Sequence, residues 1–398
     1  MSIVRRMNLD GLLQRIPVRK PFQVGLLALI IALAFCGARW VIAADQDTSQ
    51  FVVAGNVLVD RARTPAHLHV FEGIGYDGQF YWRLANDPTN LHVEAADGVI
   101  LDGPMRASRI AYPTFAWALS LGNARWVSLA LIGVNVLAFG LLAWVGAALA
   151  RRSSRHVLYG LLVAAATGLV MSLARDLIEV VMVAAIVGGI HAAREQRWVL
   201  AALAWSVAVL SHEQCLFVVG AYALWRMWEV ARKQSRVGWA DLAWVAPAAA
   251  YGTWQMIARE QVGALPIRAS GSSHIAVPFS GLLKAIGEWV QGDIARQELL
   301  VVPQLAVLVA LLVVAYRARS TVAAEDRWIL FVLVAGVAQA VMLSYGVWEG
   351  PAELRQIVLV PTLACVALVV SKVRLPLWLV GSVALVWLAT AGLRVVAI

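Results

Sequence analysis

WVSLALIGVNVLAFGLLAWVGAALA, residues 126–150, contains no charged side chain. About 20 apolar residues in a helix cross the roughly 30 Å hydrocarbon core of a bilayer, so this segment is long enough to span a membrane. The whole chain of 398 residues is 61% hydrophobic and 14% charged, with a mean hydropathy of +0.74. This composition excludes an ordinary soluble domain and predicts a membrane protein.

Apolar runs recur on both sides of this segment and predict about eleven membrane spans. They lie near residues 22–43, 126–150, 157–174, 177–193, 198–211, 214–230, 239–257, 300–316, 327–344, 353–371 and 375–395. Backbone polar groups in lipid must be satisfied within each segment, so the predicted fold is an all-α polytopic bundle. Residues 1–21 form a basic arm, and residues 22–398 form a single transmembrane domain.

The distribution of Lys and Arg predicts the orientation of the bundle. About 19 of the 33 basic residues fall on the amino-terminal arm and the alternate connections that share its face. The arm is therefore expected in the cytoplasm, and an odd number of spans puts the carboxyl terminus outside. The net charge of +9 follows from this orientation, so nucleic acid is not an expected partner. The three cysteines lie in or beside spans and suggest neither a disulfide framework nor a metal site.

Two long connections, 44–112 and 258–299, are predicted outside the cell, whereas the cytoplasmic connections are short. Connections of this length in a compact protein usually carry function or short helices of their own. Residues 78–86 and 112–122 have the pattern of short amphipathic helices that lie along the membrane surface.

The first of these connections contains Gly75-Tyr76-Asp77-Gly78-Gln79-Phe80-Tyr81. Asp77 has two compatible interpretations. It is a helix N-cap, because Asp followed by Gly and a helical run suits that position. It is also a candidate general base that takes a proton from a hydroxyl group at the membrane boundary.

Arginines in the same connection point to an anionic ligand. Arg83, Arg106 and Arg109 lie on a face that does not need basic residues for orientation. The guanidinium group matches phosphate in shape and charge. The alternative is that these arginines form surface salt bridges with aspartates of the same connection.

Later spans also carry ionisable residues at their outer ends. Asp176 and Glu179 have capping-box spacing, but charges this close to hydrocarbon also suit a wet cavity. A capping box from Ser211 to Gln214 would leave His212 and Glu213 to face such a cavity, although a lone histidine is more often structural.

The tenth span opens on Glu349-Gly350-Pro351-Ala352-Glu353-Leu354-Arg355. Pro351 and Glu353 read as ordinary first-turn residues. Arg355 is expected one turn inside the helix and needs a partner, for which a lipid phosphate is suitable. Arg268 and His274 of the second long connection are placed to cover the same site.

Together these residues resemble a known family. Tyr76-Asp77-Gly78-Gln79-Phe80-Tyr81, Arg83, Asp87-Pro88, Arg109 and Tyr112-Pro113 resemble the first outer loop of bacterial multi-span glycosyltransferases of the GT-C superfamily. Ser211-His212-Glu213 and Glu353-Leu354-Arg355 are similar to later elements of such proteins. The resemblance implies a bacterial inner-membrane enzyme that transfers a sugar from a polyprenyl-phosphate donor to an extracytoplasmic glycan or lipid acceptor.

The resemblance also implies roles for individual residues. Asp77 becomes the catalytic base, and Arg83, Arg109 and Arg355 hold the donor phosphate. The remaining pocket residues implied are Tyr76, Gln79, Tyr112, Arg175, Asp176, His212, Glu213, Arg268, His274 and Glu353. The first loop lacks an Asp-x-Asp pair, which disfavours a bound divalent metal, and no cofactor is firmly predicted. A single displacement with Asp77 as base predicts inversion at the anomeric carbon.

The sequence is also compatible with three other functions. A polymerase or ligase of lipid-linked glycans would share the arginine-rich outer pocket. A transporter or flippase for lipid-linked or anionic solutes is a second alternative, although charges in the middle of the spans are nearly absent. A non-enzymatic envelope scaffold is a third.

Overall fold

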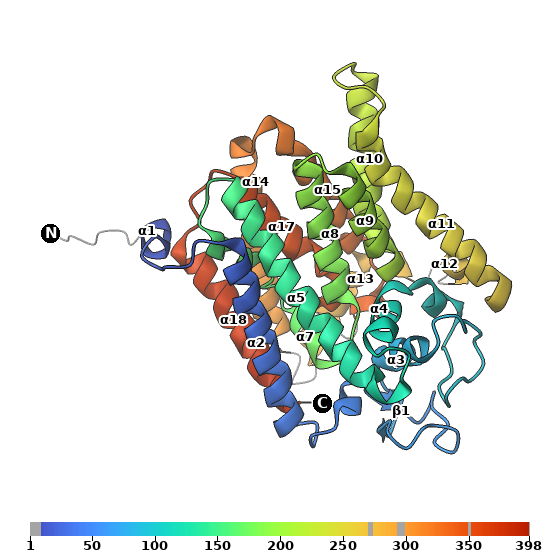
Figure 1. Cartoon of the computed structure of the whole chain (residues 1–398). Helices are drawn as coiled ribbons and strands as arrows, with labels where there is room; N and C mark the ends of the chain where they lie inside the picture. Colours follow the sequence, from blue (N-terminus) through green and yellow to red (C-terminus); the bar gives the residue numbers. More distant parts are fainter. Residues whose placement is uncertain (1–8, 270–273, 293–298, 349–351, 398) are drawn as a thin grey trace.

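The computed structural model describes residues 9–269, 274–292, 299–348 and 352–397. Nearly all the regular structure of the described chain is helical (Figure 1). Its α-helices are α1 (Leu9–Leu13), α2 (Pro21–Ile42), α3 (Gly78–Asn86), α4 (Ala111–Leu119), α5 (Val127–Arg152), α6 (Gly160–Val163), α7 (Gly168–Ala174), α8 (Glu179–Arg194), α9 (Trp198–Ser211), α10 (Cys215–Ala231), α11 (Leu242–Val262), α12 (Pro266–Ala269), α13 (Ser280–Gln291), α14 (Val301–Ala318), α15 (Arg327–Val341), α16 (Tyr345–Trp348), α17 (Leu359–Val370) and α18 (Leu377–Val396).

Short 3₁₀ turns join many of these helices. They are η1 (Thr48–Phe51), η2 (Pro104–Ser108), η3 (Ala124–Trp126), η4 (Val157–Tyr159), η5 (Trp239–Asp241), η8 (Arg319–Thr321), η9 (Ala324–Asp326) and η10 (Ala352–Ile357). Two very short strands, β1 (Ala54–Gly55) and β2 (Val70–Phe71), pair in parallel with Ala54 opposite Val70.

Every segment predicted to span the membrane contains helix, but the helices differ in length and hydropathy. Among the described residues, five are long and apolar enough to cross a bilayer: Pro21–Ile42, Ala124–Arg152, Val301–Thr321, Glu353–Val370 and Leu377–Val396. The predicted span 157–174 is instead two short pieces bent by 75°, and it makes a sixth span if both pieces count as one. Length and composition therefore support five or six spans.

Close helix packing relies on small residues. A Cβ added to Gly25 of α2 would lie 2.7 Å from Cβ of Trp144 in α5. Gly160, at the start of α6, approaches the same helix, because its added Cβ would lie 2.4 Å from the backbone nitrogen of Ala147. Small residues let helix backbones approach within a membrane, where packing replaces the hydrophobic effect as the driving force. These contacts place α2 and α6 side by side against neighbouring faces of α5.

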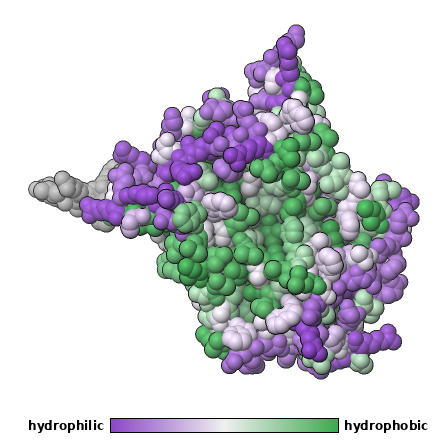
Figure 2. Space-filling model, in the orientation of Figure 1, coloured by the Kyte–Doolittle hydropathy of each residue, from purple (hydrophilic) through white to green (hydrophobic). Residues whose placement is uncertain are grey.

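The outer surface of the bundle is apolar between two polar ends. Figure 2 shows a largely hydrophobic band over α2, α5 and α18, with hydrophilic residues above and below it. Leu33 of α2, Leu137 of α5 and Leu385 of α18 expose half or more of their surface there. An exposed apolar belt of this kind fits a lipid environment. We call the end of the bundle that carries residues 9–20 the arm end, and the opposite end the loop end.

The first long connection folds into a compact structure at the loop end. The predicted helix 78–86 is confirmed as α3, and the second predicted helix forms as α4, which begins one residue earlier and ends at Leu119. Tyr81 and Trp82 of α3 are fully buried against Tyr112 of α4 and against α5. The connection therefore has its own core and holds its polar residues in fixed positions.

The carboxyl-terminal ends of α2 and α18 meet at the loop end. Arg39, near the end of α2, is buried and donates hydrogen bonds to the carbonyl oxygens of Ala174 (2.9 Å) and Arg394 (2.5 Å). Its guanidinium group thus joins α2, α7 and α18 where they reach the first connection.

Candidate functional site

Asp77 lies at the start of α3 in a turn that requires glycine on both sides. Gly75 has φ +73°, a left-handed conformation that favours glycine. A Cβ on Gly78 would lie 2.6 Å from the carbonyl oxygen of Val52 and 2.7 Å from that of Arg175. The two glycines therefore let the backbone on either side of Asp77 pass close to neighbouring segments.

The carboxylate of Asp77 is held by arginines from two distant parts of the chain. Asp77 precedes the first residue of α3, as the N-cap interpretation expected, but its side chain makes no capping hydrogen bond. Its Oδ1 lies 3.1 Å from Nη1 of Arg106, and its Oδ2 lies 3.2 Å from Nη1 of Arg355. The side chain is thus committed to ion pairs, and the capping function is not realised.

Arg355 reaches Asp77 because the chain before α17 is not an ordinary helix. Glu353 and Leu354 have φ +56° and +59°, so the expected helical first turn is wrong, and regular α17 begins only at Leu359. Two left-handed residues other than glycine are costly and persist only where surrounding contacts hold them.

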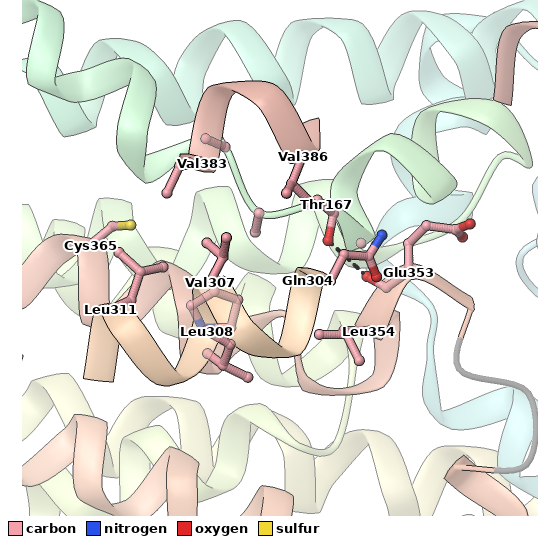
Figure 3. Close-up of a pocket in the computed structure, with 14 residues that line it drawn as sticks. Thr167, Gln304, Val307, Leu308, Leu311, Glu353, Leu354, Cys365, Val383 and Val386 are labelled. Atoms are coloured by element: carbon pink, nitrogen blue, oxygen red, sulfur yellow. Dashed lines mark hydrogen bonds between the residues drawn. The ribbon is translucent and has the colours of Figure 1, made fainter. Parts of the chain in front are cut away.

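Figure 3 shows contacts that hold this segment. The Leu354 side chain faces a small apolar cavity of about 30 Å³, while the Glu353 carboxylate turns away from it. The hydroxyl of Thr167 donates a 3.1 Å hydrogen bond to the Glu353 carbonyl. A Cβ on Gly168 would lie 2.7 Å from Cα of Arg355, so glycine allows this close approach.

A second carboxylate shares Arg355. Nη1 of Arg355 lies 3.0 Å from Oε1 of Glu179, whose Oε2 accepts a 2.8 Å hydrogen bond from the hydroxyl of Ser172. The predicted capping box from Asp176 to Glu179 does not form, because Ile178 occupies the cap position and Asp176 has φ +48°. Glu179 instead forms an ion pair that holds the Arg355 guanidinium group in place.

These groups line a hollow of about 440 Å³ at the loop end. Its charged lining residues are four arginines and two aspartates, drawn from the first connection, the α7–α8 junction, η10 and α18: Arg106, Arg175, Arg355, Arg394, Asp77 and Asp102. Tyr76 and Gln79, both predicted, also line it, as do Gly346 and Val347 of α16. Within the described ranges, no group of three or more His, Cys, Asp or Glu side chains is placed to hold a metal ion.

One lining arginine differs from the others. Arg106, Arg355 and Arg394 each contact a carboxylate, Arg394 through a 2.7 Å bond from its Nε to Glu353. Arg175 makes no ion pair with any described residue, and its guanidinium group lies 4.5 Å from the ring centroid of Tyr76. Arg175 is therefore the lining cation most available to an anion that enters the hollow.

The arginines also set the charge state of Asp77. Burial alone would raise the pKa of the Asp77 carboxyl, but Arg106 and Arg355 outweigh this effect and hold that pKa well below its usual range. Asp77 is therefore ionised at neutral pH and has no proton to donate. As long as both arginines stay paired with it, however, the carboxylate is a weak base.

A second ionic cluster lies beside the hollow without lining it. Arg109 donates to Glu213 from Nη2 (2.6 Å) and Nε (3.1 Å), and the Nδ1 atom of His212 lies 3.4 Å from Glu213. The predicted capping box from Ser211 does not form, since its hydroxyl bonds to the carbonyl of Val207. The charge of Arg109 still contributes to the lowered pKa of Asp77.

Five predicted site residues lie elsewhere, and a sixth, Glu353, contacts Arg394 without lining the hollow itself. Arg83 points away from the hollow and donates to backbone carbonyls of the same connection, including Glu94 at 2.9 Å. The hydroxyl of Tyr112 is used within the core, where it bonds to Leu131 (3.1 Å) and Asn135 (2.9 Å). Asp176 is fully buried, whereas Arg268 and His274 are exposed, and none of the three lines the hollow.

Three residues gain importance that the sequence did not give them. The sequence marks Arg106 only as one of several arginines in its connection. Its 2.7 Å pair with Asp102 is the salt bridge within this connection that the sequence offers as the alternative. Its second contact, to Asp77, depends on the fold. Arg394 had a usable signal, because an arginine near the outer end of an apolar span contradicts the charge rule for that face. Glu179 had the signal of a charge close to hydrocarbon, but its contact with Arg355 depends on the fold.

Comparisons with known proteins do not assign this chain to a family or a function. None of the protein families, curated proteins or solved structures compared with this chain matches it. The site is thus defined by its own geometry: a carboxylate, four arginines and a hollow at one end of an apolar helical bundle.

Proposed function

We propose that this protein is a membrane glycosyltransferase that moves a sugar from a polyprenyl-phosphate donor to an extracytoplasmic or lipid-linked acceptor. The observation that carries the proposal is the hollow in which Asp77 lies among four arginines, one of them without a carboxylate partner. The resemblance of the loop around Asp77 to the GT-C superfamily supports the same assignment.

The arginines suit a donor that is held by its phosphate. Arg175 offers the first contact, and its position over Tyr76 keeps the guanidinium group facing the hollow. Guanidinium groups hold phosphate through paired hydrogen bonds and stabilise the charge that develops on a leaving phosphate oxygen. The isoprenoid chain stays in the bilayer, which keeps donor and enzyme together and lowers the entropic part of the barrier.

Donor binding also activates the base. A phosphate that enters the hollow competes with Asp77 for Arg106 and Arg355, because phosphate and carboxylate oxygens accept hydrogen bonds from the same guanidinium groups. Release of either arginine removes a positive neighbour and raises the pKa of Asp77 from its lowered value. The carboxylate thus becomes an effective base only when the donor is present.

The reaction is then a single displacement. Asp77 takes the proton from the acceptor hydroxyl as its oxygen forms a bond to the anomeric carbon. The bond from that carbon to the phosphate oxygen breaks, and its electron pair leaves with polyprenyl phosphate, which the arginines hold as an anion. Attack from the side opposite the leaving group inverts the anomeric configuration.

The topology follows from the same proposal. All eleven apolar segments cross the inner membrane of a bacterium, and the short and bent helices cross it tilted. The arm end faces the cytoplasm, and the hollow faces the periplasm or cell exterior. Both long connections then lie outside and can meet a glycan acceptor.

The test uses purified full-length protein in nanodiscs with polyprenyl-phosphate sugars labelled in the sugar. Wild-type protein should release polyprenyl phosphate with at least one donor and transfer the label to an added extract of envelope lipids or glycans. A product that gains many sugars in succession would favour a polymerase.

A transport assay provides the contrasting result. The assay measures whether labelled donor crosses the bilayer of sealed liposomes that contain the protein. Movement of the donor without its consumption would contradict glycosyl transfer and favour a flippase. The absence of both donor consumption and movement across a complete donor panel would also reject the proposal.

A further inference from the structure

A second hollow lies at the arm end, on the opposite side of the bilayer-facing belt from Asp77. It has a volume of about 780 Å³ and lies where the ends of α2, α5 and α8 meet. Its charged lining residues are mostly basic: Lys20, Arg151, Arg152, Arg197 and Glu195. Nothing in the proposed transfer reaction uses this region.

Most of these cations lack an anionic partner. Arg152 pairs with Glu195 at 2.9 Å, which uses the only carboxylate that lines the hollow in the described chain. Lys20, Arg151 and Arg197 form no ion pair with any described residue. A cluster of three unpaired cations around one depression is more than membrane orientation requires, since orientation depends on the number of charges near span ends and not on their convergence.

The hollow also has an apolar wall that faces the lipid. Phe22 of α2 and Trp144 of α5 expose 55% and 48% of their surface, and both line the hollow beside Val145 and Ala148. Gly25 brings the two helices together just beneath this wall. The same depression therefore presents cations on one side and bilayer-facing hydrocarbon on the other.

A neighbouring depression has a different character. It shares Arg151 and Arg152, but its walls include carboxylates, and Arg194 there is held by Asp326 at 2.6 Å. Seven basic and three acidic residues line it, so it also carries a net positive charge, but no Phe or Trp lines it. The hollow beside Phe22 and Trp144 is the one that combines uncompensated charge with access to lipid.

We propose that this arm-end hollow binds the headgroup of an anionic phospholipid, with the phosphate against Lys20, Arg151 and Arg197 and an acyl chain along Trp144. Basic pockets between transmembrane helices at the cytoplasmic end are suited to such headgroups, and each Lys or Arg near the surface contributes to the attraction. The site is independent of the transferase reaction, and its role is to hold α2, α5 and α8 together.

The experiment is native mass spectrometry of the full-length protein with added dioctanoyl phosphatidylglycerol. A Lys20→Gln, Arg151→Gln, Arg197→Gln variant removes the three unpaired charges from the hollow. The matched control, Arg232→Gln, Lys233→Gln, Arg236→Gln, removes three charges between α10 and α11, at the same end of the bundle but outside the hollow. We expect the hollow variant to weaken binding by about tenfold or more, and the control by less than about threefold.

Two further binding measurements show whether the bound phosphate belongs to a lipid or to a soluble molecule. Glycerophosphoglycerol, which has the headgroup without acyl chains, should bind much more weakly than the lipid, and zwitterionic dioctanoyl phosphatidylcholine should not compete. Equal losses in the hollow variant and the control would overturn the proposal in favour of general surface attraction. Equal binding of the chain-free headgroup would overturn the lipid assignment in favour of a soluble phosphate. Donor consumption at the loop end should be retained in the hollow variant, so each proposal can fail separately.

Discussion

The two ends of the bundle both gather arginines, but they treat them differently. At the loop end, Arg106 lies in η2 of the first connection with Arg109 directly after η2, Arg355 comes from η10, and each contacts a buried or half-buried carboxylate. At the arm end, Arg194 pairs with Asp326 at 2.6 Å, but Arg151 and Arg197 of the basic hollow lie at exposed helix ends without such partners. Pairing alone therefore does not mark a site. The loop end differs because arginines from distant segments share one carboxylate, Asp77, at a hollow.

The burial of the ion pairs at the loop end needs a physical explanation. Removing two charges from water costs several kcal/mol per ion, and their attraction repays this only when geometry is good. A buried network such as Asp77–Arg355–Glu179 is therefore weak evidence for stability alone. The network has a function if a substrate phosphate replaces its carboxylates as the partner of the arginines. Experiments can test this difference between the loop end and the arm end.

The largest expected effect is that of Asp77→Asn on transfer. The amide keeps the shape of the side chain but cannot take a proton, so donor consumption should fall by about 10²–10⁴-fold. The measurement is the initial rate of polyprenyl-phosphate release in nanodiscs.

Asp102→Asn is the matched control for this change. Asp102 contacts the same Arg106 from the more exposed side, with 39% of its side chain accessible. Its substitution should reduce the rate by less than roughly tenfold, because no proton transfer is assigned to it. Similar losses in the two variants would mean that the pairing of Arg106 matters and that Asp77 is not the base.

Next in size is the loss of stability in Arg355→Gln. This change leaves Glu179 almost completely buried without its ionic partner, and it removes one of the two arginines on Asp77. Breaking one side of a buried pair should lower the free energy of unfolding by about 3–5 kcal/mol. Denaturant unfolding in detergent measures it.

A Glu179→Gln, Arg355→Gln double variant completes this cycle. Removing both charges avoids the unpaired buried carboxylate, so the double variant should be more stable than Arg355→Gln alone. Losses that simply add would show that the two side chains are not coupled, and that the loop end resembles the arm end after all.

Sequence patterns predicted the helical architecture well because apolar length and helix propensity are local properties. The runs at 22–43 and 126–150 correspond to α2 and α5, and the amphipathic residues 78–86 form α3. The run at 157–174 was predicted as one helix, and hydropathy cannot reveal the 75° bend that separates its two pieces. Such a bend depends on what the segment packs against.

The site was only partly predictable, for the same reason. Asp77 stood out through its glycine neighbours, and Tyr76, Gln79, Arg175 and Arg355 do line the hollow. Arg83 was assigned to the donor phosphate because its loop is rich in arginine and resembles the GT-C superfamily, yet its guanidinium group bonds to backbone carbonyls of the same connection. Capping patterns at Asp176, Ser211 and Glu353 misled because buried ion pairs and left-handed backbone replace regular helix starts at those points.

A smaller effect is expected from Gly168→Ala. The added Cβ would lie 2.7 Å from Cα of Arg355, a backbone atom that can move only with the whole η10 segment. We expect a loss of about 1–3 kcal/mol in unfolding free energy, together with slower donor consumption as Arg355 shifts from Asp77. Gly220→Ala in α10 is the control, since nothing lies within 4 Å of its added Cβ. An unchanged rate for Gly168→Ala would show that the position of Arg355 is not critical.

The smallest effect concerns the pH dependence of stability at His212. Burial, reinforced by Arg109, lowers the pKa of His212 to about 3. The unfolded chain binds a proton at this residue below its usual pKa of about 6.5, while the folded protein does not until near pH 3. Stability from this residue is therefore complete above pH 6.5 and declines as the pH falls toward 3, by about 1–2 kcal/mol between pH 6.5 and 5.

His212→Asn should remove this part of the pH dependence. The amide oxygen replaces Nδ1, which accepts a 3.3 Å hydrogen bond from the backbone of Gln214, and it does not titrate. His274→Asn, at an exposed position, is the control and should keep the wild-type slope. Unfolding curves at pH 6.5 and 5 give the comparison. A wild-type slope in His212→Asn would mean that His212 takes up a proton readily in the folded state, and the cluster with Arg109 and Glu213 would then be open to water like the basic hollow at the arm end.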